Sequence, residues 1–370
     1  QLENGKEPAL PSKTTSWQEW SRRLAEWAEA GHPREDLAFW RYVSAHVERA
    51  TLEMGSGRRN LPFDARVELR FSADLTRQVL LHAPRAYRLR VDELLLAALG
   101  RAAADVAALD ELAVSVGGHG RESIFDDVDT SRTVGSFTMV YPFLLPTRPE
   151  PREQLVEVKE RLRGTPRRGL AHGLLKHLDP DPAVREALAA EPEVSFTYLG
   201  HLDQGFAGDL FVPLGDPPGP STGPGNARSE RLGIRALIRD WCLEVEFDFS
   251  SEDLLEPEVA SLAERFERSL ELLTEHCAAP GVGGPTPSDF ELVELSFDDI
   301  ARLESARPGF LDVWPVTPAQ RGLLAQALLD ARTYLDQAVV EVPWQLDRAL
   351  FEETVSEVFS THDALRAALL

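Results

Sequence analysis

The residues with the clearest chemical potential lie in one short stretch, residues 116–122 (VGGHGRE). His119 and Glu122 can each carry a proton, and Arg121 offers a fork of donors for a carboxylate or phosphate. Three glycines surround the histidine, and glycine is used where a backbone turns sharply or approaches another group closely. The stretch therefore predicts a site for a bound molecule, with a solvated glycine-rich connection as the alternative.

Two predicted strands position this stretch. Leu112, Val114 and Val116 alternate with smaller residues, which predicts a buried strand that leads into the glycines. After an acidic loop and residues 131–135 (SRTVG), a second strand follows, with one apolar face made by Phe137, Met139, Tyr141 and Phe143. Polar groups gathered where one of two such strands ends indicate a site rather than core alone.

Composition excludes several classes of partner. The formal net charge is −22 over 370 residues, which argues against nucleic acid and anionic membrane surfaces. No apolar run reaches membrane-spanning length. Cys242 and Cys277 form neither a metal nor a disulfide pattern, so we expect no metal and a cytoplasmic location. Phosphate-binding loops, dinucleotide fingerprints, HExxH and GxSxG are all missing.

Periodicity and capping residues predict alternating helices and strands around the central pair. The predicted helices begin at Ser16, after Pro33, at Asp74 (which we expect to cap a helix to about Ala83), at Val91, after Pro151, after Pro166 and at Glu256. The predicted strands cover residues 67–71, 194–198, 232–238 and 243–249. Proline and glycine dominate residues 213–225, which indicates a mobile surface loop.

A basic cluster stands out in this acidic chain. It consists of Arg161, Arg163, Arg167, Arg168 and Lys176. Such a cluster is consistent with a solvated helix face. A phosphate-bearing partner that contacts Arg167 and Arg168 is the alternative.

Three segments divide the chain by composition. Residues 1–278 contain the elements above, and residues 279–310 form a linker segment. A run typical of a linker covers residues 278–287 (AAPGVGGPTP), and a short helix follows from Ser296. A new pattern covers residues 311–370, with a helix after Pro318, a strand through 338–342 and a helix over about 347–359. This last part has too little core to stand alone, so we expect it to be the start of another domain.

Ordered motifs resemble those of epimerization domains of nonribosomal peptide synthetases. The resemblance rests on KTTSW (13–17), GGHGRE (117–122; the family's EGHGRE), SRTVGSFTMVYP (131–142), PRRGLAHG (166–173) and FTYLGHLD (196–203). The tail resembles the opening of a condensation domain through VWPVTPAQRGLL (313–324) and HDALR (362–366). Five ordered matches over about 190 residues are far more specific than any one motif.

The resemblance implies a fold and an activity. The fold is an α/β (α+β mixed-sheet), chloramphenicol-acetyltransferase-like condensation/epimerization fold, which we expect to be incomplete at both ends, with the family's HHxxxDG motif before Gln1. The activity is inversion from L to D at Cα of an aminoacyl or peptidyl thioester on the 4′-phosphopantetheine arm of a carrier domain, in secondary-metabolite or antibiotic biosynthesis. Expected partners are an upstream carrier domain and the downstream remainder of a condensation domain, and no cofactor is bound directly.

One departure from the family bears directly on catalysis. Gly117 stands where the family has a catalytic glutamate, and glycine cannot carry a proton. Ser136 and Thr197 also depart from the family's Trp and Asn. Two hypotheses stay open: an epimerase that works without this carboxylate, or a degenerate, non-catalytic domain that serves as a spacer or docking platform. In either case the fragment alone is expected to be inactive.

The expected roles of the remaining residues follow from the same resemblance. No residue is assigned as catalytic with certainty, and His119, Arg121 and Glu122 are expected to brace the end of the strand. The candidates for lining the site are His119, Arg121, Glu122, Ser131, Arg132, Tyr141, Thr197 and Tyr198, and those for carrier contact are Arg167 and Arg168.

Overall fold

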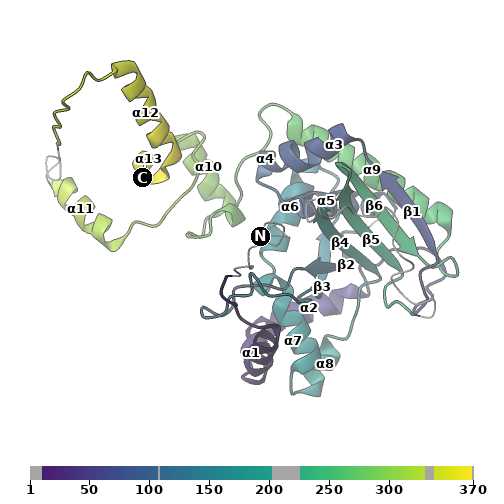
Figure 1. The fold of residues 1–370 in the computed structure, drawn as a ribbon. Helices are drawn as coiled ribbons and strands as arrows, with labels where there is room; N and C mark the ends of the chain where they lie inside the picture. Colours follow the sequence, from purple (N-terminus) through teal and green to yellow (C-terminus); the bar gives the residue numbers. More distant parts are fainter. Residues whose placement is uncertain (1–10, 107–108, 202–225, 330–336, 369–370) are drawn as a thin grey trace, which may run out of the picture. The chain divides into compact units, whose positions relative to one another are not determined.

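The computed structural model describes residues 11–106, 109–201, 226–329 and 337–368. The chain divides into two compact units, residues 1–312 and 313–370 (Figure 1). The predicted loop over 213–225 and the end of the motif at 196–203 lie outside the described residues.

A six-stranded mixed sheet forms the centre of the first unit, in the order β1-β6-β5-β4-β2-β3. The β4 strand pairs in parallel with β2 and β5, and the other neighbours are antiparallel. The strands are β1 (Ala65–Arg70), β2 (Glu111–Gly118), β3 (Met139–Pro146), β4 (Val194–His201), β5 (Leu232–Arg239) and β6 (Cys242–Phe249). Each strand predicted from alternation in this unit is present, with ends shifted by a few residues.

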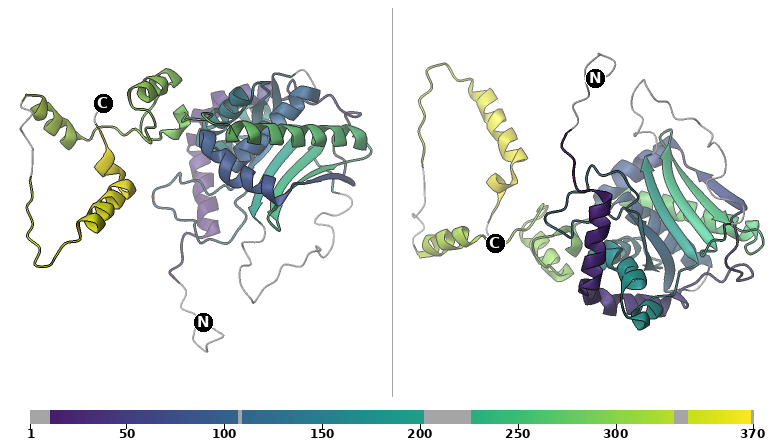
Figure 2. Two further views of the ribbon diagram at one scale, coloured as in Figure 1. Left: turned by 90° about the horizontal axis from the view of Figure 1, so that it is seen from above. Right: turned by 60° about the horizontal axis from the view of Figure 1, so that its bottom comes forward.

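Helices cover the apolar face of the sheet (Figures 1 and 2). The long helices α5 (Val91–Val106) and α9 (Glu256–Ala278) pack together over it, and α6 (Pro151–Arg163) packs beside α5. Every residue from Leu94 to Gly100 is buried, because this helix lies between the sheet and its neighbours. The other elements of this unit are α1 (Trp17–Glu29), η2 (His32–Asp36), α2 (Leu37–Val47), α3 (Ala73–Arg77), η3 (Gln78–His82), α4 (Ala83–Tyr87), η4 (Pro166–Gly169), α7 (Leu170–Leu178), α8 (Pro182–Ala187), η6 (Pro287–Asp289) and α10 (Phe297–Ala306).

The opposite face of the sheet carries charge. Glu244, Glu246 and Asp248 alternate with the apolar residues of β6, as the sequence predicts. Arg66 on β1 donates to Asp248 at 2.6 Å, and Arg235 on β5 donates to Glu246 at 2.5 Å. Opposite charges on neighbouring strands stabilise this pairing.

The predicted helix start at Asp74 is wrong by two residues. Ser72 is the cap, because its side chain accepts a hydrogen bond from the Leu75 backbone at 3.2 Å. The helical segment also continues past Ala83 to Tyr87, through a π-helical turn. A short polar residue outside the first turn is the better cap, since it can fold back onto a free backbone N–H.

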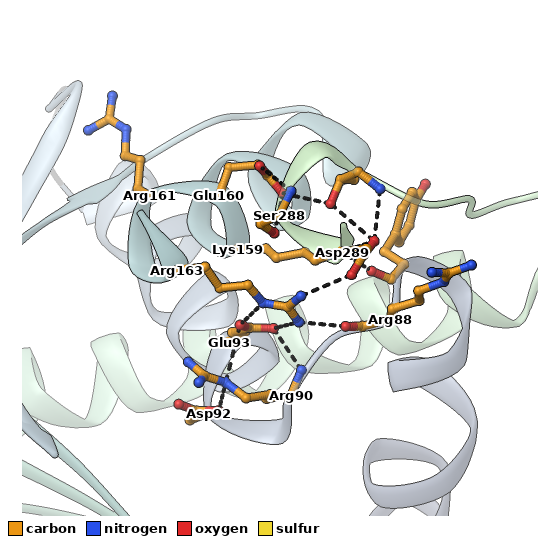
Figure 3. A network of polar contacts seen from close by, with 12 residues as sticks. Arg88, Arg90, Asp92, Glu93, Lys159, Glu160, Arg161, Arg163, Ser288 and Asp289 are labelled. Carbon is orange, nitrogen blue, oxygen red and sulfur yellow. Dashed lines mark hydrogen bonds and ion pairs between the residues drawn. The ribbon is translucent and has the colours of Figure 1, made fainter. Parts of the chain in front are cut away.

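Residues 279–310 make specific contacts with α6 of the same unit. Asp289 of η6 accepts hydrogen bonds from Lys159 at 2.7 Å and from Arg163 at 2.9 Å (Figure 3). Arg163 also pairs with Glu93 at 2.7 Å, and the Lys159 and Glu93 side chains are fully buried. A segment with the composition of a linker is therefore attached to α5 and α6 by a buried ion network.

The second unit contains α11 (Pro318–Leu329), α12 (Arg348–Thr361) and α13 (Asp363–Arg366). None of its described residues is buried. The predicted strand through residues 338–342 is wrong, since residues 337–347 form no strand. The described part of the second unit holds no other strand for these residues to pair with, and an isolated strand is not stable in water.

Candidate functional site

The glycine-rich stretch lies at the end of β2, beside β4. Gly117 pairs with Val140 of β3, and a Cβ placed on Gly117 would lie 3.3 Å from the Thr197 hydroxyl oxygen. Gly117 has no left-handed φ, so its backbone accepts other residues. Gly120 differs, because its φ is 66° and a side chain there would collide with the Phe137 carbonyl. Of these two glycines, Gly120 is therefore the one that the local geometry requires.

The turn after β2 is held by its own polar side chains. The Arg121 backbone N–H donates to His119 Nδ1 at 3.0 Å, and His119 Nε2 lies 3.3 Å from Glu122 Oε1. The Glu122 side chain is 14% exposed and lies 3.7 Å from Arg168 Nε. These contacts connect His119 and Glu122 to the turn and to η4, and the role of both residues stays a prediction.

Arg121 fixes the loop between β2 and β3. Its guanidinium donates to the carbonyl oxygens of Thr130 and, at 2.8 Å, Thr133. The same group lies 3.9 Å from the centre of the Phe137 ring, a cation–π geometry. Arg121 is thus occupied by the protein's own backbone and braces the loop.

The other candidates are divided between the two faces of the sheet. Gly117 and Thr197 lie on the charged face, whereas Tyr141 and Tyr198 lie on the face covered by helices, as the pairing register requires. Burial raises the pKa of Tyr141 to about 12, and burial also raises the pKa of Tyr198. Both phenols are therefore neutral donors at ordinary pH.

Ser131 and Arg132 are exposed on the loop before β3. The Ser131 backbone N–H donates to Asp129 at 2.9 Å, and Arg132 donates to the Ser12 carbonyl at 3.3 Å. Arg132 thus contacts the segment that enters α1, whereas Ser131 is bonded within its own loop.

Arg167 and Arg168 occupy consecutive left-handed positions, with φ of 45° and 51°. Arg167 pairs with Glu35 at 2.5 Å and with Asp36. Arg168 is 58% exposed and lies 3.7 Å from Glu122. Carboxylates of the chain thus compensate both charges, and Arg168 is the more accessible of the two carrier-contact candidates.

Sequence reasoning missed one titratable group near the tyrosines. Asp92 lies in the first turn of α5, 3.3 Å from Arg90 Nε. Burial raises the pKa of this carboxyl, and its charge in turn raises the pKa of Tyr198 and Tyr141. Only its place in the first turn of an apolar helix could have signalled it, and acidic residues are common there because they interact favourably with the helix dipole.

Each of the five stretches that carry the family resemblance contacts at least one of the others in this region. The entry to α1 contacts the loop before β3, since Trp17 Nε1 donates to the Ser136 carbonyl at 2.9 Å. The turn after β2 contacts η4 through Glu122 and Arg168. The β2 and β4 strands meet at Gly117 and Thr197. Segments distant in sequence therefore form one connected region at this end of the sheet.

Within the described residues, no group of three His, Cys, Asp or Glu side chains could hold a metal ion. No described helix is both long and apolar enough to cross a membrane.

The sheet and its helices define an α/β protein of the chloramphenicol-acetyltransferase-like class. Residues 1–295 match the family described as Condensation domain. The chain therefore belongs to the Condensation domain family.

Similar proteins include much longer synthases. A linear gramicidin synthase protein of Brevibacillus parabrevis is 33% identical over 381 residues, covering all of this chain and 7% of that protein. Bacitracin synthase 3 of Bacillus licheniformis is 29% identical over 376 residues, covering all of this chain and 6% of that protein. The chain thus spans less than a tenth of these relatives.

A solved structure of an epimerization domain is also similar. This domain, from the third module of tyrocidine synthetase B, has a TM-score of 0.66 and 30% identity, and the likeness covers 75% of this chain and 63% of that one. The fold is therefore that of condensation and epimerization domains, as the resemblance implies.

Proposed function

We propose that residues 1–278 are the C-terminal part of an epimerization domain in a cytoplasmic nonribosomal peptide synthetase. Its substrate is an aminoacyl or peptidyl thioester on the 4′-phosphopantetheine arm of an upstream carrier domain, and its product has the D configuration at Cα. The observation that carries this proposal is that the five motif stretches are connected by contacts around the end of β2 and the loop before β3. The likeness to the tyrocidine epimerization domain supports the same assignment.

Inversion at Cα sets clear chemical needs. One group removes the proton, another returns a proton from the opposite face, and donors stabilise the enolate oxygen. At the end of β2, Gly117 supplies no titratable group, and the nearest group of β4 is the Thr197 hydroxyl. We infer that the domain inverts its substrate without a carboxylate at residue 117.

The second candidate function is a degenerate, non-catalytic domain that acts as a spacer or docking platform. Gly117 is the observation that favours it, because loss of a general acid or base costs about 10²–10⁴-fold in rate. The backbone conformation does not require glycine there, although a Cβ would lie 3.3 Å from the Thr197 hydroxyl oxygen, so Thr197 would have to move by a few tenths of an ångström.

We also propose that residues 311–370 begin a condensation domain whose remainder lies downstream. The motifs at 313–324 and 362–366 support this assignment. The exposed apolar side chains of Leu350, Phe351 and Val355 on α12 fit a helix that requires further chain to cover it.

The parent synthetase module provides the test. Its carrier is loaded with an L-aminoacyl group deuterated at Cα, and both the label and the configuration are followed. Loss of deuterium with appearance of the D form supports the epimerase. Retention of both deuterium and the L form would overturn it and favour the docking platform.

A further inference from the structure

A cavity of about 410 Å³ lies between the entry to α1 and the loop before β3. Its walls are residues 11–17 on one side and 132–134 on the other. The two walls are fastened together, since the Thr15 backbone donates to the Asp129 carbonyl at 2.9 Å and the Thr14 and Thr133 hydroxyls lie 3.2 Å apart. Two segments more than a hundred residues apart therefore build this cavity. We call it the entry basin.

Two cations line the entry basin without a carboxylate partner. Within the described part of the chain, neither Lys13 nor Arg132 lies within ion-pair distance of an acidic side chain. The nearby acidic loop does not compensate them fully. Asp127 is held in a two-point pair by Arg23 at 2.9 Å, and Asp129 accepts from the Ser131 backbone, although the Arg132 charge still lowers the pKa of Asp129.

The lining of the entry basin is both cationic and apolar. The Trp17 ring contacts the loop, and a Cβ placed on Gly135 would collide with that ring. Val134 is 96% exposed beside it. A ligand that suits this lining carries a phosphate, for Lys13 and Arg132, next to an uncharged arm that can lie on the indole and the valine.

We propose that the entry basin binds the phosphate end of a pantetheine arm, with Lys13 and Arg132 as the phosphate-binding residues and Trp17 under the first part of the arm. This inference rests on the proposed function for the identity of the arm. In a chain with a net charge of −22, these two cations lie together on one cavity without an ion pair among the described residues.

Calorimetry on the 370-residue chain at low salt tests the proposal with three probes: 4′-phosphopantetheine, pantetheine and inorganic phosphate. We expect 4′-phosphopantetheine to bind at least about tenfold more tightly than either part alone, because both halves of the basin then contribute. Lys13→Gln and Arg132→Gln should each weaken it by about tenfold, and Arg132→Lys by less, since charge is kept. Arg77→Gln removes the same charge from an exposed position on α3 and should leave binding unchanged.

The outcomes separate this inference from the proposed function. Inorganic phosphate that binds as tightly as 4′-phosphopantetheine would reduce the basin to a plain anion site and overturn the proposal, as would binding that survives both Gln substitutions or no binding at all. Isomerisation by a parent module is measured separately. Inversion by the module without binding of 4′-phosphopantetheine to the entry basin would overturn this inference and support the proposed function. Binding of 4′-phosphopantetheine without inversion would support the site and overturn the proposed function.

Discussion

Two groups of cations in this protein have opposite surroundings. Around α6, Lys159 and Arg163 are enclosed by Asp289, Glu93 and backbone carbonyls (Figure 3). In the entry basin, the two cations face solvent without acidic partners among the described residues. The first group stabilises the fold and the second is free to bind an anion. A run of basic residues in a sequence therefore does not show whether these cations can bind a ligand until their acidic partners in the fold are known.

The largest expected effect comes from breaking the buried network. Asp289→Ala leaves Lys159 and Arg163 without their shared carboxylate, and removing one partner of a buried pair costs about 3–5 kcal/mol. Chemical denaturation measures this loss. Glu291→Ala, two residues along and exposed, is the matched control and should change stability by less than about 0.5 kcal/mol. Equal losses in the two variants would show that the network is not a stabilising element.

One buried imidazole is a further basic group without an ion pair among the described residues. His172 is 4% exposed against Trp40, at 5.0 Å between ring centres. Neither ring nitrogen makes a hydrogen bond of good geometry within the described chain, although the Val140 backbone is close. Burial, with smaller contributions from the Lys176 and His177 charges, lowers the pKa of His172 to about 4.

The sign of the resulting pH dependence follows from proton binding. The unfolded chain takes up a proton as the pH falls through about 6.5, while folded His172 stays neutral until about pH 4. This residue should therefore reduce the free energy of unfolding by about 2 kcal/mol between pH 7 and pH 5. Denaturation at the two pH values, compared with His172→Leu, isolates this contribution. An identical pH dependence in the two proteins would contradict the neutral buried imidazole.

A smaller effect is expected at the surface pair of arginines. Arg167→Gln breaks ion pairs with Glu35 and Asp36 that are partly solvated, so the loss should be about 1 kcal/mol. Arg168→Gln changes a residue in the same backbone conformation and loses the 3.7 Å contact with Glu122. The midpoint temperature of thermal unfolding should therefore be lower for Arg167→Gln than for Arg168→Gln. The reverse ranking would mean that the Glu122 contact matters more. The role of both arginines in carrier contact stays a prediction.

The smallest effect on stability is expected in the entry basin. Lys13→Gln and Arg132→Gln break no ion pair within the described residues, so each should shift the free energy of unfolding by less than about 0.5 kcal/mol. Denaturation curves that nearly coincide with the wild type would separate binding residues from structural ones. A loss near that of Asp289→Ala would place these cations in the same class as Lys159.

Much of the fold could be predicted from the sequence because it depends on local patterns. Alternation located the strands, and the capping sequence that begins at Ser296 located α10, whose Ser296 hydroxyl accepts from the Asp299 backbone at 3.1 Å. The strand predicted at 338–342 failed because a strand also needs a partner, which alternation does not supply. The role of the segment near Asp289 was missed for a similar reason, since its contacts come from residues 120 or more positions away.

The candidate site was predicted in part. The glycine-rich turn lies at the end of a strand, and Thr197 lies beside Gly117. The division of Tyr198 and Thr197 between opposite faces follows from alternation, but the partners of Arg121 and Arg167 do not. Hydrogen bonds to backbone carbonyls and ion pairs across the fold depend on tertiary contacts that a single sequence does not record.

Inversion at Cα without a carboxylate at residue 117 can be measured as the rate of Cα deuterium loss from the carrier-bound L-aminoacyl group. Wild-type and Gly117→Glu parent modules are compared under identical loading. We expect measurable loss with the wild type and faster loss, by about 10²-fold or more, when the carboxylate is introduced. Full retention of label and L configuration by the wild-type module would contradict it.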